Sequence, residues 1–248
     1  MNARYDVAGG VGTITLDSPH NRNALSRELM VTVRRHLAEA NAAEDVRMVV
    51  LSHTGPVFCS GMDLAESAAA DAQDLPVLQL PALLEALWTL PKPVIARVGG
   101  AVRAGGLGLL AACDLAIAAR SATFGFSEVR RGLVPALLVA TVLPQLAPVP
   151  ARELFLTGEV FDGVRAAEIG LVSAAVPEVD VEVARRVESL LQAAPGALAE
   201  TKRLVRGPFP AGRIADMQEV SARQFASAEA REGMAAFREK RPPSWITA

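Results

Sequence analysis

Apolar runs rich in β-branched residues recur along this chain, and segments with helical periodicity separate them. The runs lie at residues 46–51, 94–98, 115–119 and 172–176. A strand that is apolar at successive positions is buried on both faces, as in a parallel sheet covered by helices. Because strands and helices alternate, we predict an α/β fold in which parallel crossover units build the sheet.

The N-terminal segment carries local signals for a hairpin and a helix. Two short strands are expected at residues 5–8 and 11–16, joined at Gly9 and Gly10. A glycine pair between two such runs is typical of a tight hairpin turn. Ser26 then suits the N-cap of a helix with a single apolar face. That face comprises Leu29, Val33, Leu37 and Ala40.

Prolines in the middle of the chain limit where helices can extend. A helix is expected at residues 76–90, and Pro91 ends it because proline forces its predecessor into extended geometry. Residues 132–151 carry no charge and are about as long as a bilayer span. Several prolines in this stretch would each remove a helix hydrogen bond in lipid, so we expect no membrane span. A buried helix at residues 136–143, stopped by Pro144, is expected instead.

Strand signals stop near Leu190, and only helices are expected beyond it. We therefore divide the chain into an α/β core at residues 1–190, which holds the active site, and a helical region at residues 191–248. The expected helices lie at residues 195–206, 214–228 and 231–237. The helical region must pack either on its own core or on a neighbouring subunit.

The bulk composition argues against several function classes. The 248 residues are 51% hydrophobic with a net charge of −2, and no basic stripe of a nucleic-acid binder is visible. Cys59, Cys113 and the three histidines show no metal-ligand spacing, so no metal site is expected. The N-terminus lacks the apolar segment of a secretory signal. We therefore expect a cytoplasmic protein with reduced thiols.

Two glycine-bearing turns are the strongest candidates for a functional site. One spans residues 58–64 and the other residues 99–108, and each lies between an expected strand and an expected helix. Backbone N–H groups at a helix N-terminus lack intrahelical partners and favour negative charge. Glycine also permits close approach by a ligand. Taken alone, either turn is also compatible with an ordinary connection between a strand and a helix that has no functional role.

Together with other motifs, these turns resemble the crotonase family, also called the enoyl-CoA hydratase/isomerase family. The resemblance runs over nearly the whole chain, with its motifs in the family's order. They lie at residues 21–25, 58–64, 91–96, 105–114, 124–128, 156–158 and 231–241. The resemblance implies a spiral of ββα units with a C-terminal helical region. It also implies a homotrimer or homohexamer assembled through that region.

The resemblance implies catalytic roles for three positions. Met62 and Gly105 fall where the family supplies two backbone N–H groups to an oxyanion hole, and Glu128 falls on a catalytic glutamate. The family's other glutamate position is occupied by Gly108. Without the resemblance, the pattern favours a structural role for Glu128, as an exposed carboxylate or as a partner for Arg130 or Arg131.

The missing carboxylate leaves the reaction open between hydration and isomerisation. Two carboxylates readily divide the work of holding water and moving a proton. A single carboxylate at Glu128 suits a 1,3-proton shift, and it also suits hydration if another group positions the water. Some family members that resemble hydratases of branched or carboxylated enoyl-CoAs also lack the first glutamate and share the 108–114 and 127–135 segments. We therefore predict an enoyl-CoA hydratase of fatty-acid-type metabolism, with Δ3-Δ2-enoyl-CoA isomerase as the alternative.

The remaining positions matched by the family bind the substrate. Arg22 and Lys240 match positions at which family members bind the phosphates of CoA. Lys240 is expected to come from a neighbouring subunit. Asp63 sits beside an oxyanion donor and is expected to be structural rather than catalytic. Further positions expected at the substrate are Ala24, Ser60, Gly61, Leu64 and Gly106. The only coenzyme implied is the CoA of the acyl-CoA thioester itself.

Two other function classes compete with this prediction. Residues 106–111 fit a loose dinucleotide-binding pattern, but the next strand follows too soon, and Arg120 stands where an acid is needed. The missing glutamate also suits a non-catalytic acyl-CoA binder. Conversion of an enoyl-CoA distinguishes an enzyme from such a binder.

Overall fold

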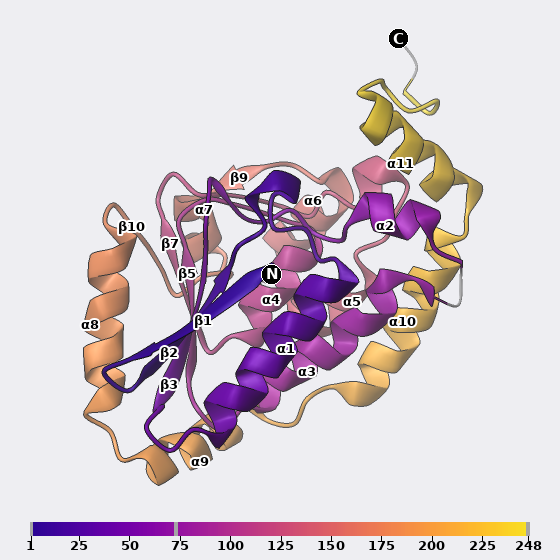
Figure 1. Ribbon diagram of the computed structural model, residues 1–248. Helices are drawn as coiled ribbons and strands as arrows, with labels where there is room; N and C mark the ends of the chain where they lie inside the picture. The colour runs from indigo at the N-terminus through magenta and orange to yellow at the C-terminus, as the bar shows by residue number, and fades with distance from the viewer. Residues whose placement is uncertain (1, 72–73, 247–248) are drawn as a thin grey trace.

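The structure is a computed structural model that describes residues 2–71 and 74–246 (Figure 1). Its larger sheet has six strands in the order β1-β2-β3-β5-β7-β10. Only the β1–β2 pair is antiparallel, and the other neighbours pair in parallel. The strands are β1 (Ala3–Ala8), β2 (Val11–Leu16), β3 (Met48–His53), β5 (Val94–Val98), β7 (Leu115–Ala119) and β10 (Ala174–Val176). The predicted parallel α/β architecture is confirmed.

A second sheet of four short strands accompanies the first, in the order β4-β6-β8-β9. Its strands are β4 (Val57–Cys59), β6 (Ala101–Arg103), β8 (Thr123–Gly125) and β9 (Phe161–Asp162). Each of β4, β6 and β8 follows one strand of the larger sheet and precedes a helix. The repeating unit is thus strand–strand–helix, as the family resemblance implied. These short strands were not expected from the sequence pattern.

The N-terminal hairpin and first helix form as predicted. Gly9 and Gly10 have φ angles of +56° and +82°, which a tight turn between right-twisted strands requires. Helix α1 (Arg27–Ala42) begins at Ser26, whose Oγ accepts a hydrogen bond from the Leu29 N–H at 3.2 Å. The four apolar residues of its predicted face are all buried.

Helices of the core differ from the expected boundaries in three places. A 3₁₀ turn, η3 (Pro76–Gln79), precedes α3 (Leu80–Thr89), so the expected helix at residues 76–90 is not continuous. Helix α5 (Ala136–Thr141) ends early, and Pro144 lies inside the 3₁₀ turn η5 (Leu143–Gln145) rather than stopping a helix. Proline fits early positions of a helical turn because no N–H is needed there.

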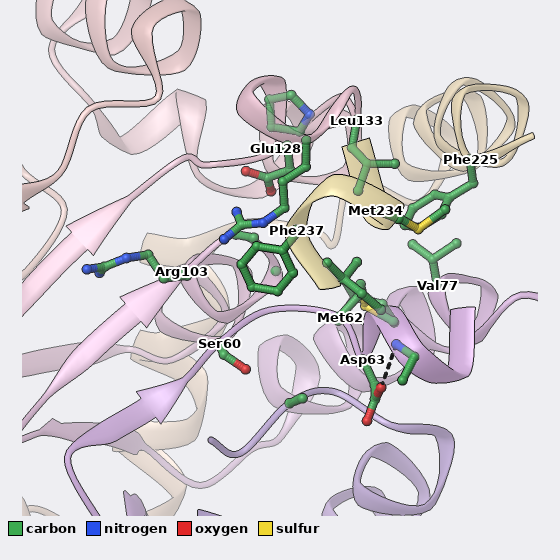
Figure 2. A pocket seen from close by; sticks show the side chains of 18 of the residues that line it. Ser60, Met62, Asp63, Val77, Arg103, Glu128, Leu133, Phe225, Met234 and Phe237 are labelled. Carbon is green, nitrogen blue, oxygen red and sulfur yellow. Dashed lines mark hydrogen bonds between the residues drawn. The ribbon is translucent and has the colours of Figure 1, made fainter. Parts of the chain in front are cut away.

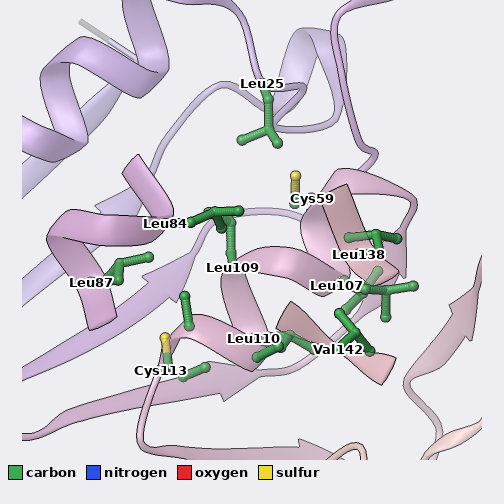
Figure 3. Packing of buried hydrophobic residues seen from close by; sticks show 14 of the residues in the cluster. Leu25, Cys59, Leu84, Leu87, Leu107, Leu109, Leu110, Cys113, Leu138 and Val142 are labelled. Atoms are coloured by element: carbon green, nitrogen blue, oxygen red, sulfur yellow. The ribbon is translucent and has the colours of Figure 1, made fainter. Parts of the chain in front are cut away.

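Helix α4 (Gly105–Ala112) is the third difference, because it begins inside the glycine-rich run that was expected to be a loop. All eight of its residues are buried. Figure 3 shows the leucines of this helix packed among Leu84, Cys59 and Leu138. A Cβ at Gly106 would lie 2.9 Å from the Cys59 Cβ, so glycine lets this helix approach β4 closely. Burial in the core outweighs the poor helix propensity of glycine here.

The helical tail packs on its own core. It follows α8 (Val179–Leu191), which covers one face of the larger sheet, and contains α9 (Pro195–Arg206), α10 (Ala211–Phe225) and α11 (Ala228–Glu239) (Figure 1). Helix α9 is docked through Lys202, whose Nζ lies 2.7 Å from Asp114 Oδ2. Helix α10 packs on α5, and α11 packs on η4 (Val129–Arg131). The tail's role in oligomerisation stays a prediction, and its residues 247–248 lie outside the described part.

The remaining helices are short. They are α2 (Leu64–Ala69), α6 (Pro148–Thr157) and α7 (Gly163–Glu168). Within the described residues, no helix combines the length and apolar character that a membrane crossing needs.

Candidate active site

A cavity of about 470 Å³ lies where the core meets the helical tail. Its walls come from the β2–α1 connection, the β4–α2 turn, the start of α4, the segment after β8, and helices α10 and α11. Figure 2 shows Glu128 and Phe237 near one another, with Ser60, Met62 and Asp63 on another wall. Residues far apart in the sequence therefore share one concave site.

The β4–α2 turn fixes the direction of the Met62 N–H group. The Leu25 N–H donates to the Gly61 oxygen at 2.8 Å, and the Asp63 N–H donates to the Leu25 oxygen at 3.3 Å. In a parallel ladder, the residue between two such bonds directs its own N–H to the opposite side. The Met62 N–H meets no hydrogen-bond acceptor among the described residues. It is thus an unengaged donor at the cavity wall.

The Gly105 N–H is a second donor at this part of the cavity for which the described residues provide no acceptor. Gly105 is the first residue of α4, so its N–H has no intrahelical acceptor. The two turns touch, since a Cβ at Gly61 would lie 3.5 Å from the Gly105 nitrogen and 2.7 Å from the Ala104 Cβ. Gly61 itself has a φ angle of +91°. The structure therefore brings Met62 and Gly105 to adjoining positions of one cavity.

Glu128 is the buried carboxylate of this cavity. Its relative exposure is 9%, and its Oε2 has no hydrogen-bond partner among the described residues. Burial raises the pKa of Glu128 to about 7, against the opposing effects of its own backbone N–H and the nearby Arg131 charge. A carboxyl group with such a pKa exchanges a proton readily near neutral pH. The exposed-carboxylate interpretation is therefore wrong.

Gly108 is outside the cavity lining, and leucine side chains pack closely against it. A Cβ there would lie 3.2 Å from Leu138 Cδ2 and 3.5 Å from Leu84 Cδ2. The space that a glutamate would need is filled by leucine side chains of α3 and α5. Among the described residues, the cavity carboxylates are therefore Glu128 and Asp63.

Asp63 is engaged in holding the local fold. Its Oδ1 accepts hydrogen bonds from the N–H groups of Ala65 at 3.0 Å and Glu66 at 3.1 Å. Its Oδ2 accepts one from the Asn21 amide at 3.3 Å. Asp63 is thus the N-cap of α2 and ties this helix to the β2–α1 connection.

The other predicted substrate residues divide into two groups. Those that line the cavity are Arg22, Ala24, Ser60 and Leu64. Those outside its lining are Gly61, Gly106 and Lys240. Gly61 and Gly106 lie behind the cavity wall, where the absence of a side chain lets neighbouring backbone segments approach closely. Lys240 is exposed at the C-cap of α11, and its contribution to a neighbouring subunit's site stays a prediction.

Several cavity residues were not anticipated from the sequence. From the tail come Ser221, Phe225, Met234, Phe237 and Arg238, and from the core Arg103 and Arg131. The apolar spacing of the last helix signals a buried face, yet a single sequence does not show what that face covers. Arg103 donates to the Val102 and Thr123 backbone oxygens at 2.9 and 2.7 Å, and burial lowers its pKa.

Two glycines bring α11 onto the segment that carries Glu128. A Cβ at Gly132 would lie 2.3 Å from the Glu229 oxygen, and a Cβ at Gly233 would lie 2.1 Å from the Arg131 oxygen. Only glycine allows these backbones to approach so closely. The tail thereby forms part of the site instead of a separate appendage.

Comparison with known proteins decides the family. A model described as enoyl-CoA hydratase/isomerase matches residues 6–247. The chain belongs to the enoyl-CoA hydratase/isomerase family. It is 36% identical over 251 residues to a protein of Rhodobacter capsulatus named probable enoyl-CoA hydratase, covering 97% of this chain and 96% of that one.

Solved structures agree with this membership. The crystal structure of an enoyl-CoA hydratase from Mycobacterium avium has a TM-score of 0.89 at 39% identity, covering 99% of both chains. The structure of a carnitinyl-CoA hydratase from Mycobacterium avium has a TM-score of 0.87 at 32% identity, covering 98% of both chains. The chain has the crotonase fold that these enoyl-CoA hydratase/isomerase family members share.

Proposed function

We propose that this family member is an enoyl-CoA hydratase, which adds water to the double bond of a 2-enoyl-CoA and removes it again. The observation that carries this proposal is the meeting of Glu128 with two unengaged backbone N–H groups, those of Met62 and Gly105, at one cavity. The names of similar proteins, including an enoyl-CoA hydratase and a carnitinyl-CoA hydratase, support hydration.

In the proposed reaction the thioester oxygen accepts hydrogen bonds from the Met62 and Gly105 N–H groups. The ionised Glu128 takes a proton from water as the water oxygen bonds to C3 of the enoyl group. The electron pair of the double bond moves toward the thioester, whose oxygen becomes an enolate. Glu128 then gives its proton to C2, so hydroxyl and hydrogen add across the bond and the carboxylate is regenerated.

The two N–H groups act where negative charge develops. Preorganised donors of this kind stabilise an enolate more than the neutral carbonyl, and loss of one donor costs about 10²–10³ in rate. Because the donors belong to the backbone, the side chain of Met62 is free to vary. The low effective dielectric of a partly buried cavity strengthens these hydrogen bonds relative to bulk water.

Isomerisation is the second candidate, and the packing around Gly108 favours it. With Glu128 as the one carboxylate in place for proton transfer, a 3-enoyl-CoA could lose a C2 proton to Glu128 and regain it at C4. The same enolate and the same two donors serve both reactions. A single carboxylate therefore allows both hydration and isomerisation. Which reaction occurs depends on whether the cavity holds a water molecule beside C3.

The CoA portion is proposed to bind along Arg22, Ala24, Ser60 and Leu64, which line the cavity on the side of the β4–α2 turn. Arg22 would meet a CoA phosphate. Assembly as a trimer or hexamer, with Lys240 reaching a neighbouring subunit, and a cytoplasmic location remain part of this proposal.

The deciding experiment presents a 2-enoyl-CoA and a 3-enoyl-CoA separately and identifies the products by mass spectrometry. Gain of one water from the 2-enoyl ester is the expected result. An isobaric 2-enoyl product from the 3-enoyl ester would show isomerisation instead. Glu128→Gln should abolish turnover, while Glu153→Gln, an exposed carboxylate of α6, should leave it unchanged.

Two outcomes would contradict the proposal. If Glu128→Gln keeps the wild-type rate, proton transfer by Glu128 is wrong. If CoA esters bind and no enoyl-CoA of any chain length is converted, the protein is a non-catalytic acyl-CoA binder.

A further inference from the structure

Asn23 is a fully buried amide that bonds to three backbone groups. Its relative exposure is 0%, and it is outside the cavity lining. Its Oδ1 accepts a hydrogen bond from the Ser18 N–H at 2.7 Å. Its Nδ2 donates to the Thr54 oxygen at 3.1 Å and to the Val57 oxygen at 2.8 Å, so both amide hydrogens are used. Asn23 therefore cross-links the β2–α1 connection to the chain that enters β4.

The backbone at Asn23 has an unfavourable conformation. Arg22 and Asn23 have φ angles of +60° and +53°, in the left-handed region that residues other than glycine seldom occupy. Such strain persists only where the surrounding structure enforces it, and it is concentrated at functional sites. The three hydrogen bonds of the Asn23 side chain hold this pair of residues in place.

The strained segment, residues 22–25, runs beside the turn that presents the Met62 N–H. The Ser60 N–H donates to the Arg22 oxygen at 3.2 Å. Leu25 forms an isolated parallel bridge with Met62, and the two backbone hydrogen bonds of Leu25 described above flank Met62. The direction of the Met62 N–H therefore depends on where the segment lies.

Leu25 also contacts the second donor residue. A Cβ at Gly105 would lie 3.1 Å from the Leu25 Cδ1 and 3.8 Å from the Met62 Sδ, so the Leu25 side chain packs closely on Gly105. A displacement of Leu25 would thus change the separation of the two N–H groups. An oxyanion needs both donors at about 2.7–3.1 Å, and misplacement by about 1 Å can cost roughly 10²-fold in rate.

We propose that Asn23 is a positioning residue, whose cross-link fixes residues 22–25 and thereby, through Leu25, directs the Met62 N–H at the thioester oxygen. This inference rests on the proposed function, because it takes that oxygen to lie between the Met62 and Gly105 N–H groups. Since Asn23 is outside the cavity lining, it acts through its neighbours and not by touching the substrate.

Asn23→Gly removes the cross-link while glycine keeps the positive φ angle at no steric cost. We expect kcat to fall by about 10²-fold and KM to change little, because the two donors stabilise the developing enolate more than the neutral thioester. Asn23→Ala loses the same hydrogen bonds and adds backbone strain. It should unfold at a lower urea concentration than Asn23→Gly and have the same kcat.

Infrared difference spectroscopy reads the two donors without turnover. The ligand is butyryl-CoA with an isotope-labelled thioester carbonyl, a saturated ester that is neither hydrated nor isomerised. Hydrogen bonds to the carbonyl oxygen lower its stretching frequency. Binding to the wild type should therefore lower this frequency, and Asn23→Gly should lose part of that lowering.

Two further variants control for general damage. Lys202→Met removes a buried cation of α9 outside the cavity lining, so it should lower stability and leave both kcat and the carbonyl frequency unchanged. Asn23→Ser retains one hydroxyl donor and should show a smaller loss of both quantities than Asn23→Gly. It provides the test if the Asn23→Gly protein does not fold.

Several results would overturn the inference. A folded Asn23→Gly protein with the wild-type kcat is one, and a lowered kcat with the wild-type carbonyl frequency is another. If none of the three position-23 variants folds, Asn23 is required for folding itself and the positioning role is wrong. Failure of the proposed function would appear separately, as a carbonyl frequency that does not fall when butyryl-CoA binds the wild type.

Discussion

Substitution of Gly61 by alanine should separate the two turns that present the Met62 and Gly105 N–H groups. The new Cβ would lie 2.7 Å from the Ala104 Cβ and 3.2 Å from the Arg103 oxygen. Ordinary carbon–carbon contacts are about 3.5–4.0 Å, so the turns must move apart by roughly 1 Å. Misplacement by about 1 Å can cost roughly 10²-fold in rate. We therefore expect Gly61→Ala to lower kcat by about 10²-fold.

The same substitution should also lower the free energy of unfolding. A side chain in the left-handed region costs about 1–2 kcal/mol, and overpacking costs about 1–3 kcal/mol more. Gly9→Ala is the matched control, because Gly9 also has a positive φ angle and a Cβ there would meet no atom within 4 Å. It should incur the backbone cost alone and leave kcat unchanged.

Urea unfolding followed by circular dichroism gives the stabilities, and initial rates on the substrate identified by the product assay give kcat. A folded Gly61→Ala protein with at least a third of the wild-type kcat would refute the reasoning. So would a Gly9→Ala protein whose kcat falls by the same factor, because the loss would then not come from the contact between the turns.

Three further predictions follow from buried contacts. Burial lifts the Glu128 pKa from an ordinary value of 4.5 to about 7, so the folded chain holds this proton more tightly and loses stability as pH rises through that window. In urea unfolding, the free energy of unfolding of the Glu128→Gln protein should equal that of the wild type at pH 4 and exceed it by up to about 3 kcal/mol at pH 8. An equal difference at both pH values would contradict this. Lys202→Met removes one of the two cations paired with Asp114, which keeps Arg206 at 3.2 Å, and should lower the free energy of unfolding by about 1–3 kcal/mol. Arg203→Met on the exposed face should change little, and equal losses in urea unfolding would count against a docking role for Lys202. Gly233→Ala should push α11 away from the segment that carries Glu128 and lower both kcat and the melting temperature. Gly212→Ala, on α10 where a Cβ would meet no atom within 4 Å, should lower neither. An unaffected Gly233→Ala protein would show that the contact is dispensable.

Local chemistry made part of the fold predictable from the sequence. The hairpin at Gly9 and Gly10 needs positive φ angles that glycine adopts freely, and the Ser26 side chain satisfies one of the orphan N–H groups of α1. Both signals act within a few residues and do not depend on the rest of the molecule. The motif resemblance placed Glu128, Met62 and Gly105, and the structure brings these three to one cavity.

Features set by long-range packing were not predictable in the same way. The strands β4, β6 and β8 have three residues each, too short for a periodic pattern, and their pairing connects distant segments. Helix α4 forms across glycines because its neighbours bury it completely. The tail's position over its own cavity depends on backbone contacts at Gly132 and Gly233, which no local pattern reveals.

Deuterium incorporation at C2 tests most directly whether Glu128 moves a proton beside the thioester. The wild type, incubated in D₂O with the 3-hydroxyacyl-CoA and 2-enoyl-CoA pair, should place one deuteron at C2, detectable by mass spectrometry. Glu128→Gln should place none while still binding the thioester. Incorporation at the wild-type rate in Glu128→Gln would show that another group carries the proton.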